Sequence, residues 1–465
     1  MVGGVGGVAA VALPNPLIGV GAAVGAVIGV LMLGSPLFTL ATVEVVACLL
    51  PFGTIPLKLG LTFTMLEASL LVLFGVWLVQ IAVRAPGQTS LVAWPFSWAV
   101  WLFVSLTLFT FGLGWDTSHD EQTIHNFAKL LLAVLSFVVV INLVRSQVAL
   151  ERLLRVLILA GSGAALLAVV LYRLPFSLQE RLLLTLRPIG YPVDRVLRFV
   201  EDDMQKPQRA TGTSVDPNSF AGMLVLIFAL IFAQLISPSP LFRRWKLALM
   251  LLVTGLAMFL TYSRAAILLG VVAIILFLAL VKYRRIWLYL IPATLGSGLI
   301  LRQTPLWDRF AGGFALSDPA TIMRLNEYKN ALDIVQHYPW FGVGFGHAPV
   351  IDLTTGVSSV YLSIAERMGL VGLAGYMLVL LLFFGYVISS AAHLKNLRQT
   401  AILLGFAAGL AGALATGSLD YYFFDIRFPH MAALFWLTMG LAVAQVKIAR
   451  SDEPAPPTTR ILSRK

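Results

Sequence analysis

Residues 324–346 form a polar, patterned segment with a candidate proton-transfer residue inside an otherwise apolar chain. Its apolar residues recur at helical spacing, which predicts an amphipathic helix with one buried face. They are Leu325, Tyr328, Leu332 and Val335. Pro339 disfavours helical geometry at the preceding residue, so His337 falls in the last turn, before a glycine-rich turn that would let backbone approach a bulky ligand. An imidazole exchanges a proton near neutral pH, and His337 is therefore the candidate catalytic residue.

Two arginines stand where the chain is expected to meet the membrane surface. Arg209 precedes Asp216 and Pro217, a helix cap followed by proline at the first helical position. Arg264 lies between two apolar runs with almost no loop, at the start of the second, where free N–H groups and the helix dipole favour an anion. Two guanidinium forks suit a pyrophosphate, so we predict that Arg209 and Arg264 bind one. Anchoring of Arg209 to lipid phosphate is the simpler alternative.

Three further polar residues of the long connections are secondary candidates: Arg187, Arg324 and Glu327. The connections contain no Asp-x-Asp signature, and the acidic pair Asp202–Asp203 sits among arginines that could pair with it. We therefore predict no metal and no cofactor. Arginines would then supply the positive charge.

The composition requires a membrane protein. Of 465 residues, 59% are hydrophobic and only 12% are charged, with a mean hydropathy of +0.89, which exceeds what a water-soluble core can bury. The net charge of +11 favours anionic lipid and an anionic substrate over nucleic acid, since no basic cluster marks a soluble domain. Cys48 is the only cysteine, which excludes an intrachain disulfide.

The apolar runs predict an all-α polytopic integral membrane protein with about 12 transmembrane helices. The runs lie near 16–50 (one span plus a shorter or broken segment), 62–83, 93–114, 126–144, 153–173, 217–236, 245–262, 264–281, 286–302, 361–391, 399–419 and 427–446. Residues 1–447 form one transmembrane domain, with the N-terminal run retained because residues 1–16 lack the basic region of a signal peptide. The Pro-rich residues 448–465 are expected to form a disordered tail.

Short basic turns fall on every second connection, which makes them cytoplasmic by the positive-inside rule. They include Arg145, Arg152, Arg243, Arg244, Lys282, Arg284, Lys395 and Arg398, followed by the tail. The tail is then cytoplasmic, and the long connections 174–216 and 303–360 lie on the opposite side. Both are basic, against the usual depletion of cations there, which indicates an external site for an anion.

Three segments in the second half of the chain resemble the O-antigen ligase and polymerase family of the bacterial inner membrane. They are residues 209–218, residues 261–270, and residues 324–346 followed by 361–372. Many relatives carry a His-Asn pair just before the Tyr-Leu step, where this chain has Ser358 and Ser359. The departure leaves His337 as the better match to the ligase histidine.

The resemblance implies a C-type glycosyltransferase-like fold with a periplasmic helical loop region. It implies a multi-pass protein of the inner membrane whose donor is O-antigen polysaccharide on undecaprenyl pyrophosphate and whose acceptor is lipid A-core oligosaccharide. In the expected reaction an acceptor hydroxyl displaces the pyrophosphate without a metal and with inversion. His337 would act as base while Arg209 and Arg264 hold the leaving group.

Several alternatives remain open at the level of sequence. An O-antigen polymerase or a protein O-oligosaccharyltransferase would use the same donor with another acceptor. A transporter of lipid-linked sugar would also bind an anion, although the two halves of the chain look dissimilar and the charges gather at one surface. A helix C-terminus favours imidazolium, so His337 could instead donate a proton or hydrogen bond to the pyrophosphate.

Overall fold

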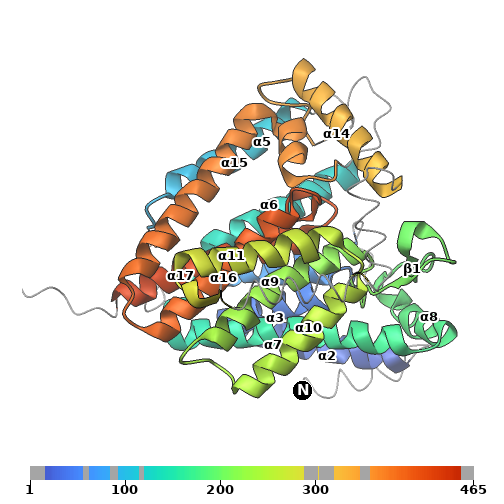
Figure 1. Cartoon of the computed structure of the whole chain (residues 1–465), viewed down its shortest axis with the longest axis horizontal. Coiled ribbons are helices and arrows are strands. Elements are labelled where there is room, and N and C mark those ends of the chain that lie inside the picture. Colours follow the sequence, from blue (N-terminus) through green and yellow to red (C-terminus); the bar gives the residue numbers. More distant parts are fainter. Residues whose placement is uncertain are drawn as a thin grey trace, which may run out of the picture.

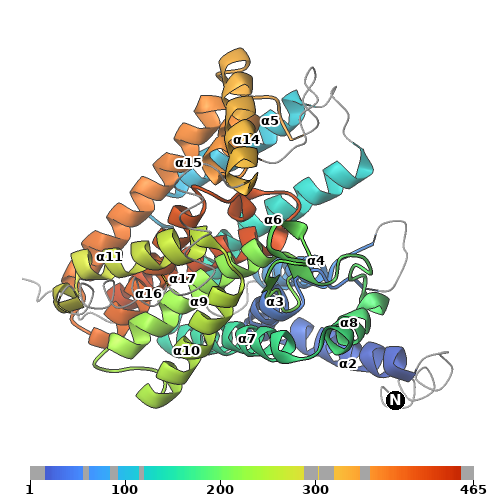
Figure 2. The same cartoon turned by 45° about the vertical axis from the view of Figure 1, so that its right-hand side comes forward.

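The computed structural model describes residues 16–55, 62–83, 93–114, 120–286, 288, 302, 319–345 and 357–451. The described chain is a bundle of helices (Figures 1 and 2). These are α2 (Pro16–Gly34), α3 (Pro36–Leu49), α4 (Met65–Ala82), α5 (Ser97–Leu113), α6 (Glu121–Leu143), α7 (Gln147–Arg173), α8 (Phe176–Leu184), α9 (Pro217–Ile236), α10 (Arg244–Leu260), α11 (Val271–Val281), α14 (Pro319–His337), α15 (Val360–His393), α16 (Leu397–Thr416) and α17 (Pro429–Ser451). Short 3-10 turns and one π-helix, η4 (Ala265–Gly270), join them.

The described helices confirm an all-α polytopic membrane protein. Seven of them are long and apolar enough to cross a bilayer: α4, α6, α7, α9, α15, α16 and α17. Four shorter apolar helices accompany them. The span predicted at 286–302 lies almost entirely outside the described residues, as does the tail from residue 452, so the count of twelve stays a prediction. Residues 448–451, predicted to open the tail, still belong to α17.

The core lies where α9, α16 and α17 meet. α17 packs along α6, and α16 packs along α9. Glycines at Gly405, Gly409 and Gly412 bring α16 close to α9, and a Cβ at Gly412 would lie 2.7 Å from Val225 Cγ1. Lipid offers no hydrophobic drive for helix association, so this close approach through small residues is what stabilises the contact.

The basic connections gather at one end of the bundle. Arg398, at the start of α16, lies 3.6 Å from Glu151 of α7 and donates to the Ser239 carbonyl between α9 and α10. Gln147 of α7 bonds to Gln445 near the end of α17. Connections that the charge pattern assigned to one side of the membrane therefore meet in space.

The other end carries the polar segments. A two-stranded hairpin, which the all-α prediction did not include, pairs β1 (Arg198–Phe199) with β2 (Gln208–Arg209) beside α8 at the right of Figure 1. α14 lies above the bundle, packed on α15.

The glycine-rich turn after α14 contacts α15. α15 is interrupted at Gly369, whose φ is +66°, and the N–H of Leu370 donates to the Pro339 carbonyl at 2.7 Å. At Gly342, also at positive φ, a Cβ would lie 2.3 Å from the Glu366 carbonyl oxygen. The described glycines of this turn thus admit the chain's own backbone, where the sequence suggested a ligand.

Candidate functional site

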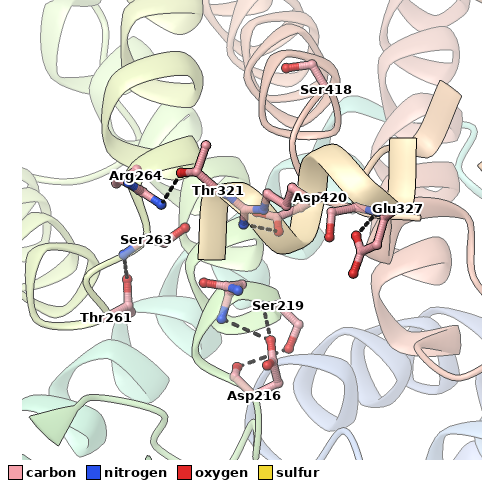
Figure 3. A network of polar contacts seen from close by, with 12 residues as sticks. Asp216, Ser219, Thr261, Ser263, Arg264, Thr321, Glu327, Ser418 and Asp420 are labelled. Atoms are coloured by element: carbon pink, nitrogen blue, oxygen red, sulfur yellow. Dashed lines mark hydrogen bonds and ion pairs between the residues drawn. The ribbon is translucent and has the colours of Figure 1, made fainter. Parts of the chain in front are cut away.

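Segments distant in sequence meet at the polar end of the bundle in a group of charged side chains (Figure 3). We call this group the arginine–carboxylate cluster. It comprises Arg209, Asp216, Arg264, Arg324, Glu327 and Asp420. They come from the hairpin, the start of α9, the turn after α10, α14 and the loop between α16 and α17.

Arg209 is held from two sides. Its Nε donates to the Thr261 carbonyl at 2.7 Å, and its Nη2 donates to the Asn218 side chain. A guanidinium has five N–H donors, so the others remain without a hydrogen-bond partner among the described residues. Burial lowers the pKa of Arg209, and the nearby Asp216 and Asp420 carboxylates oppose that shift. The side chain is therefore fixed in place with donors left for a ligand.

Asp216 caps α9 as the sequence predicted. Its Oδ1 accepts from the N–H groups of Asn218 at 2.9 Å and Ser219 at 2.7 Å, and Pro217 is the first helical residue. The preceding Val215 has a φ of +59°, a left-handed conformation that is unfavourable for a β-branched residue. The chain thus bears local strain where it enters α9.

Arg264 immediately precedes the π-helix η4, at the helix N-terminus expected for it. Its Nη2 donates to Thr321 Oγ1 in α14 at 3.3 Å. The turn before it places Tyr262 at a φ of +56°, and the Ser263 N–H donates to Thr261 Oγ1 at 3.2 Å. A π-helix is a rare element that frequently marks functional sites.

Arg324 and Asp420 form a buried ion pair. Arg324 Nη2 lies 3.4 Å from Asp420 Oδ1, and the two side chains are 18% and 3% exposed. The other carboxylate oxygen, Asp420 Oδ2, is buried without a hydrogen-bond partner among the described residues. Burial raises the pKa of Asp420 to about 7, opposed by Arg324. The sequence analysis did not single out Asp420, although it is the lone acid between Thr416 and Tyr421 in a predicted external turn.

Glu327 and Tyr328 attach α14 to its neighbours. The Ser358 N–H donates to Glu327 Oε2 at 3.0 Å, and the Tyr328 hydroxyl lies 2.9 Å from the Ser358 carbonyl and 3.1 Å from the Ser418 carbonyl. The backbone of Ser358 is thereby joined to two residues of α14.

His337 lies at the other end of α14. It follows Arg324 by thirteen residues, which at about 1.5 Å per residue separates the two by about 20 Å. Its side chain is 67% exposed, and its Nδ1 donates to the Asp333 carbonyl at 2.9 Å. The structure therefore brings Arg209, Arg264, Arg324 and Glu327 together but leaves His337 apart.

Arg187 also lies apart. It opens the 3-10 turn η2 (Arg187–Ile189), where its side chain is exposed. Within the described segments no hydrogen bond or ion pair joins it to the arginine–carboxylate cluster. Nor do the described residues contain a group of three or more His, Cys, Asp or Glu that could hold a metal ion. Independence from metal stays a prediction.

Comparison with protein families gives a match in the second half of the chain. No curated protein matches the chain. Residues 248–377 match the family model described as O-Antigen ligase, and this stretch contains Arg264, Arg324, Glu327 and His337. Arg209 and Asp420 lie outside the matched stretch, and the packing of the helices brings them next to it. The match supports the resemblance found in the sequence, and residues 248–377 are similar to the O-antigen ligase family.

Proposed function

We propose that this protein is a metal-independent, inverting glycosyltransferase that moves O-antigen polysaccharide from undecaprenyl pyrophosphate to lipid A-core oligosaccharide. The observation that carries the proposal is the convergence of Arg209, Arg264 and Arg324 on one site in a chain that is similar to the O-antigen ligase family over residues 248–377. Arginine binds phosphate oxygens in a bidentate manner, and three such groups can share one pyrophosphate.

The arginines would stabilise the leaving group. As the bond to the anomeric carbon breaks, negative charge grows on the pyrophosphate, and fixed cations in a partly buried site stabilise that charge without reorganising. Arg209 is the best fixed of the three, since Thr261 and Asn218 hold its position. Arg264 reaches α14 through Thr321, one turn before Arg324.

The site would face the periplasm. The arginine–carboxylate cluster lies at the end of the bundle opposite the contacts of Arg398 and Gln147, where the basic connections meet. Under the positive-inside rule those connections are cytoplasmic, as is the C-terminus, in a multi-pass protein of the inner membrane.

The sequence predicts His337 as the proton acceptor. At about 20 Å from Arg324 it cannot touch the same headgroup in this arrangement. A base role for His337 therefore requires α14 to shift when substrates bind. The substitution His337→Ala tests this requirement, because a solvent-exposed side chain can be removed with little effect on folding.

The deciding experiment is reconstituted transfer. The purified protein is mixed with lipid-linked polysaccharide and lipid A-core, with and without chelator. Loss of one oriented donor to a developing anion costs roughly 10²- to 10³-fold in rate. We expect losses of that order for Arg209→Ala and Arg264→Ala. Arg181→Ala is the matched control, because it removes an exposed arginine of α8 outside the cluster.

The outcome separates the alternatives. Transfer to a second lipid-linked glycan or to a protein, but not to lipid A-core, would replace the ligase by a polymerase or a protein oligosaccharyltransferase. Movement of the donor across the membrane without any glycosidic product would indicate a transporter. Near-normal transfer by both Arg209→Ala and Arg264→Ala would refute the pyrophosphate site.

A further inference from the structure

We propose that Asp420, in place of His337, is the proton acceptor of the transfer and receives the proton of the attacking hydroxyl on Oδ2. This inference rests on the proposed function, since it requires a transfer in which a hydroxyl attacks. It assigns a catalytic role to a residue outside the matched family domain.

The two oxygens of Asp420 have different environments. Oδ1 faces the Arg324 guanidinium at 3.4 Å, which holds the carboxylate in one orientation. Oδ2 is buried and has no hydrogen-bond partner in the described part of the chain. A buried polar atom without a partner is costly and uncommon in folded proteins, and a substrate that supplies the missing hydrogen bond offsets that cost.

The loop that carries Asp420 is held by its neighbours. The Val360 N–H donates to the Gly417 carbonyl at 2.8 Å and to the Asp420 carbonyl at 3.1 Å. The Tyr328 hydroxyl bonds to the Ser418 carbonyl. Catalytic groups work best when such neighbouring contacts fix their orientation. The backbone position of Asp420 is thus set by the start of α15 and by α14.

Charged groups on each neighbouring element act on this carboxylate. Burial raises its pKa, Arg324 and Arg209 lower it, and Asp216 and Glu327 raise it, which gives a value of about 7. A general base works best when its pKa is near the working pH. Near neutral pH Asp420 therefore binds a proton more strongly than an exposed aspartate, whose pKa is near 4.

The other carboxylates of the cluster bind backbone N–H groups through one oxygen each. Asp216 accepts two backbone N–H groups at the start of α9, and Glu327 accepts from the Ser358 N–H. The buried His430 has two ring nitrogens without partners, but its ring packs against Phe52 at 5.0 Å and Phe428 at 6.0 Å. Asp420 is the described member of the cluster whose unpartnered carboxylate oxygen is buried.

The chemical step balances without an added reactant. The acceptor oxygen forms a bond to the anomeric carbon, and the bond from that carbon to the pyrophosphate oxygen breaks. The pyrophosphate leaves with the electron pair while the hydroxyl proton passes to Asp420 Oδ2. Release of this proton to water restores the carboxylate for the next cycle.

The test is the pH dependence of transfer by wild type and Asp420→Asn. The amide keeps an oxygen for Arg324 but cannot accept the proton. For wild type we expect kcat/KM to rise about tenfold per pH unit below pH 7 and to level off above it. Asp420→Asn should lose this rise and have a plateau roughly 10²- to 10⁴-fold lower. Binding of a lipid pyrophosphate analogue should be retained.

Asp194→Asn, an exposed aspartate of the external segment, is the matched control and should keep the wild-type profile. As a second variant, Arg324→Gln removes a cation that lowers the pKa of Asp420, so its rise in kcat/KM should move to higher pH. An Asp420→Asn protein that keeps the rise, or transfers within threefold of wild type, overturns the inference. So does a wild-type profile that is flat between pH 5 and 9. Absence of transfer by wild type with every acceptor would instead refute the proposed function.

Discussion

The substitution Gly369→Ala should uncouple α14 from α15. Gly369 has a φ of +66° and a ψ of −174°, a conformation that is essentially restricted to glycine. An added Cβ would lie 2.2 Å from the backbone carbon and oxygen of Trp340, so the two segments must separate. Separation breaks the bonds from the Leu370 N–H to Pro339 and from the Val371 N–H to Trp340.

The expected loss of stability is the sum of the backbone strain and the two lost hydrogen bonds. The strained conformation contributes about 1–3 kcal/mol, and the two hydrogen bonds contribute about 0.5–1.5 kcal/mol each. We therefore expect a loss of about 2–6 kcal/mol in the free energy of unfolding, measured in detergent by denaturant titration. Transfer should also fall, because the turn that ends α14 loses its attachment.

Gly385→Ala in the same helix is the matched control. A Cβ at Gly385 meets no atom within 4 Å, and alanine is favoured over glycine in a helix by about 0.5–1 kcal/mol. This variant should be as stable as wild type or slightly more stable. If Gly369→Ala unfolds within 1 kcal/mol of wild type, the steric reasoning is wrong.

Three further predictions concern the cluster. Tyr328→Phe removes the hydroxyl that bonds to the Ser358 and Ser418 carbonyls. Because each hydrogen bond contributes about 0.5–1.5 kcal/mol, the variant should have lower thermal stability and a lower kcat. An unchanged Tm would contradict this. Val215→Gly relieves a left-handed β-branched residue, and this relief exceeds the cost of the added chain entropy of glycine, so the variant should be more stable by about 1 kcal/mol in thermal unfolding; a lower Tm would contradict this. The pKa of Asp420 is higher in the folded state than in the unfolded state. Its contribution to the free energy of unfolding is therefore fully present below the unfolded pKa near 4 and is lost as pH rises through about 7. Between pH 5 and 8 the Tm of Asp420→Asn should therefore rise relative to wild type, and a constant difference would contradict the assignment.

Local features of the site were predictable from the sequence. The Asp216–Pro217 cap, the helix ending at His337 and the approximate spans all depend on residues close in the chain, where capping and periodicity act. That Arg209 and Arg264 share one end of the bundle followed from counting spans. The separation of His337 from Arg324 also follows from helix geometry, since thirteen residues of helix cover about 20 Å.

Other features depended on packing that no local pattern contains. Asp420 is a lone carboxylate in a short turn, and its environment comes from Arg324, Arg209 and Asp216 on other elements. The sequence analysis interpreted the glycines of the turn after α14 as room for a ligand. In the structure they contact the break of α15 at Gly369, and this break could not be predicted because it lies inside an apolar span. Contacts of this kind join residues whose spacing carries no periodic signal.

The π-helix η4 has a consequence for insertions and deletions. A π turn contains one residue more than an α turn, so the six residues from Ala265 to Gly270 accommodate a surplus residue without shifting α11. Removing one residue there would restore α-helical winding and keep Arg264 in register with α11, whereas removing one residue within α11 would rotate the two parts of that helix by about 100° relative to each other. A one-residue deletion between Ala265 and Gly270 should therefore preserve the contact of Arg264 with Thr321, a tolerance that the regular helix α11 does not have.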